Sequence, residues 1–300
     1  MKYDLILVRY GEIALKGKEV RRRFEDTLIQ NIKNAFFKEK IESKINKEYG
    51  RIFIFTSQID KSLIILKKIF GINSISPVFK TISTLEKISD LAQIVAKENI
   101  DKNKSFAIRA SRTGNHSFTS QKVAEFVGSN IVKSTNASVN LTNPDFELFI
   151  EVRNKDCYIF TEKIRCAGGM PVGSQGKVLA LIENTDSILA AWYMVHRGCK
   201  LVLLNTSKKN DDIIESFTNN WLLNPDIFKI NSSEDLFLKI NDISKQLECK
   251  ALVTGHSLIN TSLEEIKEFK KHINLPILFP IIAMDKDEIK KNSKGIGLNK

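Results

Sequence analysis

A polar turn of five residues, Glu183–Asn184–Thr185–Asp186–Ser187, carries the residue types best placed to do chemistry. It follows an apolar stretch over 178–182, typical of a buried strand, and precedes an amphipathic helix that ends at Gly198. Free backbone N–H groups and the positive end of a helix dipole converge at such a turn, which is where α/β proteins hold phosphates. Turns of this kind normally contain glycine, so that the backbone can touch the ligand, and this one contains none. Whether the chain is an enzyme depends on this turn.

A second chemical signal is positive charge, which is concentrated in the first part of the chain. Residues 1–175 contain 29 Lys and Arg against 19 Asp and Glu, whereas residues 176–300 contain 17 against 16. This one-sided surplus favours a polyanion-binding region, with nucleic acid as the preferred partner. For the basic run over 16–23, solvation or pairing with neighbouring acids is an equally good interpretation. The candidate phosphate contacts are Lys16, Lys18, Arg21, Arg22, Arg23, Arg109, Arg112 and Lys122.

The composition is that of a soluble globular protein of two or three domains, since a single core seldom exceeds about 250 residues. No run approaches the roughly 18 apolar residues of a membrane helix, and the N-terminus reads as a strand and not as a signal peptide. The cysteines are widely spaced and form no CxxC pair (Cys157, Cys166, Cys199, Cys249). They predict reduced, mostly buried thiols in a cytoplasmic protein, and no metal site.

The elements that must position these residues fall into three groups. Residues 1–77 predict strand, helix, two strands around Gly50, helix and strand, which is the ferredoxin-like α+β order. Residues 78–166 predict an α/β domain: a helix over 84–98, a strand over 105–110, a loop over 111–118, a helix over 121–133 capped by Thr119 or Ser120, and a hairpin over 147–163. A Gly- and Pro-rich connector over 166–176 marks the next boundary.

From residue 167 to 300 the pattern predicts a doubly wound, mainly parallel sheet. Strands are expected over 178–182, 200–205, 227–230, 251–254 and 277–279. Helices are expected over 187–197, 211–220, 233–248 and 262–272, with a short one from Asp285. Ligands of such sheets bind at the carboxyl ends of the strands. The turn over 183–187, the loop after Asn205 and residues 255–260 are therefore expected to form the site.

Several segments resemble the tRNA 4-thiouridine synthetase family, also known from thiamine thiazole biosynthesis. RYGEIALKGK (9–18) is similar to the family's N-terminal signature, and GGMPVGSQGKVLAL (168–181) is close to its connector. SFAIRASRTGNHSFTSQKVAEFVG and EVRNKDCYIF resemble its THUMP domain, an RNA-binding module. TGHSL (254–258) and LPILFPIIAMDKDEI (275–289) resemble its PP-loop ATP pyrophosphatase domain, a fold of the adenine nucleotide α-hydrolase type.

The resemblance implies a function as well as a fold. Family members bind tRNA through the ferredoxin-like and THUMP domains, adenylate a uridine oxygen with ATP and Mg²⁺, and then displace AMP with a persulfide sulfur. It implies tRNA as partner, a sulfur-donor protein, and pairing of two copies. The residues that match ATP- or phosphate-binding positions are Thr185, Asp186, Ser187, Gly255 and Ser257.

The catalytic half departs from the family pattern in three places. The SGGxDS turn is replaced by the shorter Glu183–Ser187 segment, which keeps only the final Asp186 and Ser187, and Glu183 adds a like charge where pyrophosphate would lie. The segment before TGHSL is short and contains the acidic DDIIESF, and GHSLINTSL lacks a glycine and a glutamine of the family's run. No cysteine follows Cys249, so the persulfide-handling cysteine has no evident equivalent.

Three hypotheses follow. The chain is a reduced tRNA sulfurtransferase that uses Asp186 and Ser187 for Mg–ATP and a partner for sulfur. Alternatively, it is a tRNA-binding paralogue whose PP-loop domain serves a structural or docking role. A nucleotide-binding protein acting outside RNA is the third and is least consistent with the charge surplus. Local chemistry favours the second, and no catalytic residue is assigned.

Overall fold

The computed structural model describes residues 1–300 except 16, 49, 232–233 and 299–300, and it divides into two compact units. Unit 1 comprises residues 1–9, 36–67 and 74–165, and unit 2 comprises residues 10–35, 68–73 and 166–300. In the part of the chain so described, no helix has the length and apolar character that crossing a membrane would require.

The first elements follow the ferredoxin-like order that the sequence predicts. They are β1 (Leu5–Arg9), the 3-10 helix η1 (Glu12–Leu15), α1 (Lys18–Lys38), β2 (Lys44–Glu48), β3 (Arg51–Phe55), α2 (Ile59–Leu66) and β4 (Ser74–Ile82). The strands are antiparallel neighbours in the order β2–β3–β1–β4. The alternation of RIFIF in β3 turns Ile52 and Ile54 to one face and Phe53 to the other, and all three are buried.

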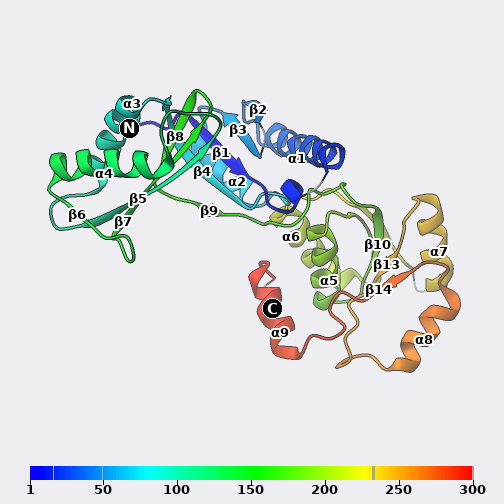
Figure 1. Ribbon diagram of the computed structural model, residues 1–300. Coiled ribbons are helices and arrows are strands. Elements are labelled where there is room, and N and C mark those ends of the chain that lie inside the picture. The colour runs from blue at the N-terminus through cyan, green and yellow to red at the C-terminus, as the bar shows by residue number, and fades with distance from the viewer. Residues whose placement is uncertain (16, 49, 232–233, 299–300) are drawn as a thin grey trace. The chain divides into compact units, whose positions relative to one another are not determined.

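The second half of unit 1 is a mixed sheet covered by two helices. Its elements are α3 (Leu85–Asn99), β5 (Ser105–Thr113), α4 (Ser120–Thr135), β6 (Ser138–Val139), β7 (Phe146–Arg153), β8 (Asp156–Phe160) and β9 (Ile164–Arg165). The apolar faces of α3 and α4 share one core with the inward residues of β5, β7 and β8 (Figure 1). The Thr119 hydroxyl accepts a hydrogen bond from the Lys122 backbone N–H, which confirms Thr119 as the cap of α4.

One strand joins the two halves of unit 1. The first part of β4 pairs with β1 and its last part, from Phe79 to Ile82, pairs with β8. All strands of unit 1 therefore belong to one continuous sheet. The domain boundary expected near residue 77 falls inside β4, and it stays a prediction.

Two sequence predictions in this region were wrong. The loop expected over 111–118 begins later, because β5 continues to Thr113 in parallel register with β7, with Arg112 opposite Val152. The second strand of the hairpin ends at Phe160, because residues 164–165 pair with β4 as β9 instead. Both errors come from strand partners that are distant in the sequence.

Unit 2 contains the predicted doubly wound sheet. Its elements are β10 (Lys177–Ile182), α5 (Thr185–His196), β11 (Lys200–Asn205), the 3-10 helix η2 (Lys208–Asn210), α6 (Asp211–Asn220), β12 (Asp226–Lys229), α7 (Leu236–Gln246), β13 (Leu252–Val253), α8 (Leu263–His272), β14 (Ile277–Leu278) and α9 (Lys286–Gly295). All neighbours are parallel in the order β12–β11–β10–β13–β14. The expected start of α7 at 233 lies outside the described residues, and the helix is seen from Leu236.

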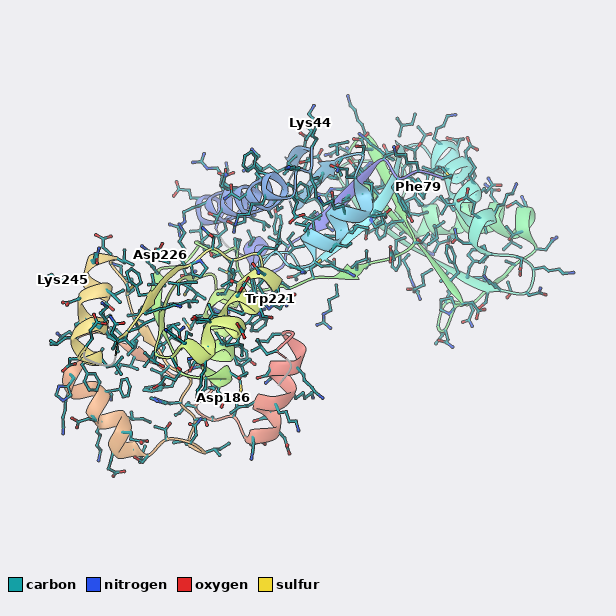
Figure 2. All side chains as sticks on the ribbon, turned by 180° about the vertical axis from the view of Figure 1, so that it is seen from behind. Lys44, Phe79, Asp186, Trp221, Asp226 and Lys245 are labelled. Atoms are coloured by element: carbon teal, nitrogen blue, oxygen red, sulfur yellow. The ribbon has the colours of Figure 1, made fainter. Side chains whose placement is uncertain are left out.

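Helices cover both faces of this sheet. Val178, Ala180 and Ile182 of β10 pack with α5, α6 and α9, while Leu179 and Leu181 pack with α7 and α8 on the other face (Figure 1). β10 is the central strand of this sheet. The next strands in the sequence, β11 and β12, lie on one side of β10, and the later strands β13 and β14 lie on its other side, so the direction of strand succession reverses at β10. Asp186 lies at the carboxyl end of the strands, and Asp226 lies at the opposite end (Figure 2).

Candidate functional site

The turn between β10 and α5 satisfies its own backbone donors. The backbone N–H groups of Asp186 and Ser187 donate to Oδ1 of Asn184 at 2.9 and 3.1 Å. The Glu183 N–H donates to the Ser187 hydroxyl at 3.3 Å. These are the donors that a phosphate at a helix N-terminus would use. The Asn184 side chain is an N-cap that takes the place of such an anion.

The loop after β13 packs against this turn. A Cβ atom added to Gly255 would lie 2.6 Å from Cα of Ser187 and 2.8 Å from the carbonyl carbon of Asp186. Only glycine allows the backbone to approach the start of α5 so closely. The backbone of Gly255 therefore packs directly on that of Ser187, which leaves no space for a phosphate between the two residues.

An acidic side chain stands beside the turn. The Glu183 carboxylate lies 3.6 Å from Nε2 of His256, and about a third of the Glu183 side chain (35%) is exposed. Partial burial raises the pKa of Glu183, and His256 opposes that shift. The His256 ring lies against Phe269 and Phe279. A negative charge here repels an incoming phosphate.

The loop after β11, also expected to reach the ligand, is closed by hydrogen bonds. The Ile182 carbonyl accepts from the Thr206 N–H and hydroxyl and from the Asn210 side chain. Asn205, itself buried, donates to Asp211 at 2.6 Å. The polar groups at the ends of β10 and β11 are thus paired with each other.

The donor set therefore does not fit the triphosphate of ATP in this turn. The two amides that would hold it are bonded to Asn184, and the turn has no glycine. Thr185 begins α5, and Ser187 is buried. Asp186 lines a cavity of about 830 Å³.

A basic cavity of unit 1, here called the arginine cavity, was only in small part predicted from the sequence. It has a volume of about 750 Å³ and is lined by Arg109 together with Arg9, Arg51 and Lys163, beside the first turn of α4. Its one acidic lining residue is Glu151. Four cations against one carboxylate make this cavity a site for an anion. The sequence feature that could have indicated this cavity is a single arginine in an otherwise apolar strand, as in β1 and β3.

Buried charges hold this cavity in shape. Glu151 lies 2.8 Å from Arg51, 3.1 Å from Arg153 and 3.5 Å from Arg9. Burial alone raises the pKa of Glu151, but the three guanidinium groups outweigh burial, and the net pKa is lowered. Burial lowers the pKa of Arg9 to about 10, so it stays charged at neutral pH. The cluster keeps a net positive charge of two.

Aromatic rings support the same cations. The Arg9 guanidinium lies 4.6 Å from the Phe160 ring centre, and Nζ of Lys163 lies 4.3 Å from that of Phe149. The two phenylalanine rings are stacked at 5.2 Å. Cation–π contacts at this range orient the charged groups without neutralising them.

The remaining predicted RNA contacts lie elsewhere. Lys18, Arg22 and Arg23 line a separate cavity of about 1260 Å³ in unit 2 with Lys200, here called the α1 cavity. Arg21 instead lies 3.9 Å from Glu25. Among the residues predicted from the sequence, Lys16 lies outside the described residues, and Arg112 and Lys122 do not line the arginine cavity.

Three of the four cysteines have little thiolate character. Cys157, Cys199 and Cys249 are buried, as the sequence predicts. Burial raises the pKa of each. A thiol must ionise to carry or transfer sulfur, so these three are poorly suited to it.

Comparisons with known proteins agree with this architecture. Family models match the ThiI ferredoxin-like domain over residues 5–76, the THUMP domain over 83–162, and the thiamine biosynthesis protein ThiI over 232–300. A probable tRNA sulfurtransferase of Methanobrevibacter smithii is 32% identical, over 99% of this chain and 87% of the relative. One of Methanothermobacter thermautotrophicus is 34% identical, over 99% and 85%. The chain belongs to the tRNA sulfurtransferase family.

Solved structures place this sulfurtransferase-family chain in the same fold. PH1313 of Pyrococcus horikoshii is 29% identical with a TM-score of 0.85, covering 98% of this chain and all of that one. A 4-thiouridine synthetase solved as an RNA complex with bound ATP is 26% identical with a TM-score of 0.82, covering 99% and 86%. The resemblance drawn from the sequence and its fold class are confirmed.

Proposed function

We propose that this chain is a tRNA-binding protein in which ATP-dependent thiolation of a tRNA uridine is weakened or lost. The observation that carries RNA binding is the arginine cavity, whose lining holds three arginines and a lysine but only one carboxylate. Phosphate contacts from Arg and Lys supply most of the affinity for RNA backbone, and guanidinium planes also stack on unpaired bases. The relationship to a synthetase solved with RNA supports the same partner.

RNA binding has a direct test in this cavity. We expect Arg109→Ala and Lys163→Ala together to weaken binding of a tRNA acceptor-stem minihelix by about tenfold or more, and to lower the salt slope by roughly one to two. These side chains are more exposed than the buried cluster, so the fold should persist. Lys133→Ala, at the end of α4 and outside the cavity, is the matched control. An unchanged affinity and slope in the double variant would refute RNA binding at this cavity.

The loss of thiolation rests on the turn between β10 and α5. Its amides bind Asn184, Gly255 lies directly on the helix start, and Glu183 adds negative charge. The three buried thiols are equally unsuited to sulfur transfer. We therefore expect purified protein with tRNA, ATP and Mg²⁺ to release no pyrophosphate above background, and to release no AMP and form no 4-thiouridine when a persulfide donor is added.

The alternative is an active tRNA sulfurtransferase that takes sulfur from a partner protein. The retained Asp186, which lines an open cavity, favours it. Pyrophosphate release that requires tRNA and ATP and disappears in Asp186→Ala would establish this alternative. Pairing of two copies also stays a prediction, which light scattering of the purified protein tests.

A further inference from the structure

A small cavity of unit 2 lies at the end of the parallel sheet opposite to the turn that begins α5. It has a volume of about 320 Å³ and is lined by the starts of β10, β11 and β12, by the residues just before β12 and by the end of α5. Asp226, one of its lining residues, lies at the other end of the sheet from Asp186 (Figure 2). The volume is at the lower limit of the range of about 300–1,000 Å³ that is usual for small-ligand sites. It is called the amino-end cavity below.

Charged side chains of both signs line the amino-end cavity. Lys177 begins β10 and is the direct register partner of Lys200, which begins β11. Neighbouring strands lie about 4.8 Å apart, so like charges at paired positions destabilise the sheet unless an anion lies between them. Asp226 begins β12 opposite Val202, and therefore on the same side of the sheet as Lys200.

The residues that the structure describes neutralise none of these charges. Lys177, Lys200 and Asp226 form neither an ion pair nor a side-chain hydrogen bond with any described residue. Burial raises the pKa of the neighbouring Cys249 thiol, Lys177 lowers it and Asp226 raises it further. A positive and a negative group therefore lie near the same thiol, and both are available to a ligand.

The rest of the lining is mostly apolar. It consists of Val172, Val195, Leu201, Leu223 and Pro225, with Asn224 as a neutral polar group. An apolar wall beside two cations and one anion fits a ligand with a short apolar body, a negative group and a positive group. An α-amino acid with an aliphatic side chain has all three. Inorganic phosphate has no positive group, and Asp226 would repel it.

We propose that the amino-end cavity binds a free α-amino acid with an aliphatic side chain, its carboxylate between Lys177 and Lys200 and its ammonium group on Asp226. The aliphatic side chain packs against Val195 and Leu201, which line the same cavity. This inference goes beyond the proposed RNA binding, which depends on unit 1. Lys200 also lines the α1 cavity, so an RNA contact through this lysine is the competing explanation that the experiment must separate.

Calorimetric titration of the full chain with leucine, isoleucine and valine tests the site. Isocaproate and isoamylamine, which are leucine without its ammonium group and without its carboxylate, are titrated beside them. We expect a saturable heat from at least one of the amino acids, and an affinity at least about tenfold lower for each analogue of leucine.

Substitutions assign the charges of the ligand to their partners. Lys177→Gln with Lys200→Gln should weaken amino-acid binding by about tenfold or more. Asp226→Asn should remove the preference for leucine over isocaproate, because it removes the partner of the ammonium group. Lys250→Gln is the matched control: Lys250 is exposed, its N–H donates to the Lys177 carbonyl, and it does not line the cavity. Its amino-acid affinity should stay within about twofold of wild type.

Several results would overturn the proposal. One is the absence of saturable heat from all three amino acids, and another is an affinity that the double lysine substitution leaves unchanged. If no amino acid binds but the double lysine variant weakens minihelix binding, the two lysines belong to an RNA surface and the proposal is wrong. Arg109→Ala with Lys163→Ala should leave amino-acid affinity unchanged, so this proposal and RNA binding in unit 1 can fail independently.

Discussion

Gly255 packs its backbone directly on Ser187, so that a Cβ atom at position 255 would lie 2.6 Å from Cα of Ser187. Real Cβ atoms do not approach backbone this closely, so α5 or the loop after β13 would have to move. We expect Gly255→Ala to lower the free energy of unfolding of unit 2 by about 1–3 kcal/mol. Both tryptophans, Trp192 and Trp221, lie in unit 2, so urea unfolding followed by tryptophan fluorescence reports on it.

Gly295 in α9 is the matched control for this substitution. A Cβ atom there meets nothing within 4 Å. Gly295→Ala should be neutral or stabilising by up to about 1 kcal/mol, because alanine favours helix. Equal effects of the two substitutions would contradict the packing described for Gly255.

The contribution of the Asn184 cap to stability can be measured separately from its effect on phosphate affinity. Asn184→Ala should cost about 0.5–2 kcal/mol of stability, and Asn184→Gly only a few tenths. Glu183→Ser combined with Asn184→Gly should free the amides of Asp186 and Ser187 and raise pyrophosphate affinity by about tenfold. Pyrophosphate titration of this double variant and of the wild-type chain measures the change. An unchanged affinity would show that the cap is not what excludes phosphate.

The buried Glu151 predicts an acid-dependent stability of unit 1. Its pKa is lowered from 4.5 by Arg51, Arg9 and Arg153 against the opposing effect of burial. A carboxylate with a lowered pKa stabilises the fold above its unfolded pKa, and this contribution is lost as the pH falls through the folded pKa. Wild-type unit 1 should therefore lose stability below about pH 4.5.

Removing the carboxylate leaves three arginines without their shared counter-charge. Glu151→Gln should cost about 3–5 kcal/mol at pH 7 and should flatten the acid dependence. Hydrogen exchange of the β7 amides measures both effects within unit 1. Glu147→Gln, in the exposed pair with Arg109, should cost about 1 kcal/mol or less. If the two variants show the same acid dependence, Glu151 is not its source.

Only two of the three consecutive arginines at the start of α1 line the α1 cavity. Arg22 and Arg23 line it, whereas Arg21 pairs with Glu25. If RNA also reaches this surface, Arg22→Ala with Arg23→Ala should weaken minihelix binding several-fold and reduce the salt slope by roughly one to two, while Arg21→Ala should not. Fluorescence anisotropy over a salt series distinguishes these outcomes. Equal effects of all three arginines would indicate a diffuse field and not a defined contact.

Local patterns predicted the elements well, because period and caps depend on near neighbours. The apolar run before Glu183 became β10, and Thr119 became the cap of α4. The arginine cavity was not predictable in the same way. Arg9, Arg51 and Glu151 lie on three strands that are distant in the sequence, and only the register of the sheet brings them together. The self-capping of Asn184 likewise depends on a side-chain rotamer that residue type alone does not fix.

The two halves of unit 1 share the strand β4. Its first residues complete the ferredoxin-like sheet, and Phe79 to Ile82 complete the sheet with β8. β4 forms backbone hydrogen bonds with strands of both halves. A chain cut at residue 77 would therefore expose an unpaired sheet edge in either half. Truncated versions for functional work should therefore keep β4 whole, and separate expression of either half should yield aggregation-prone material.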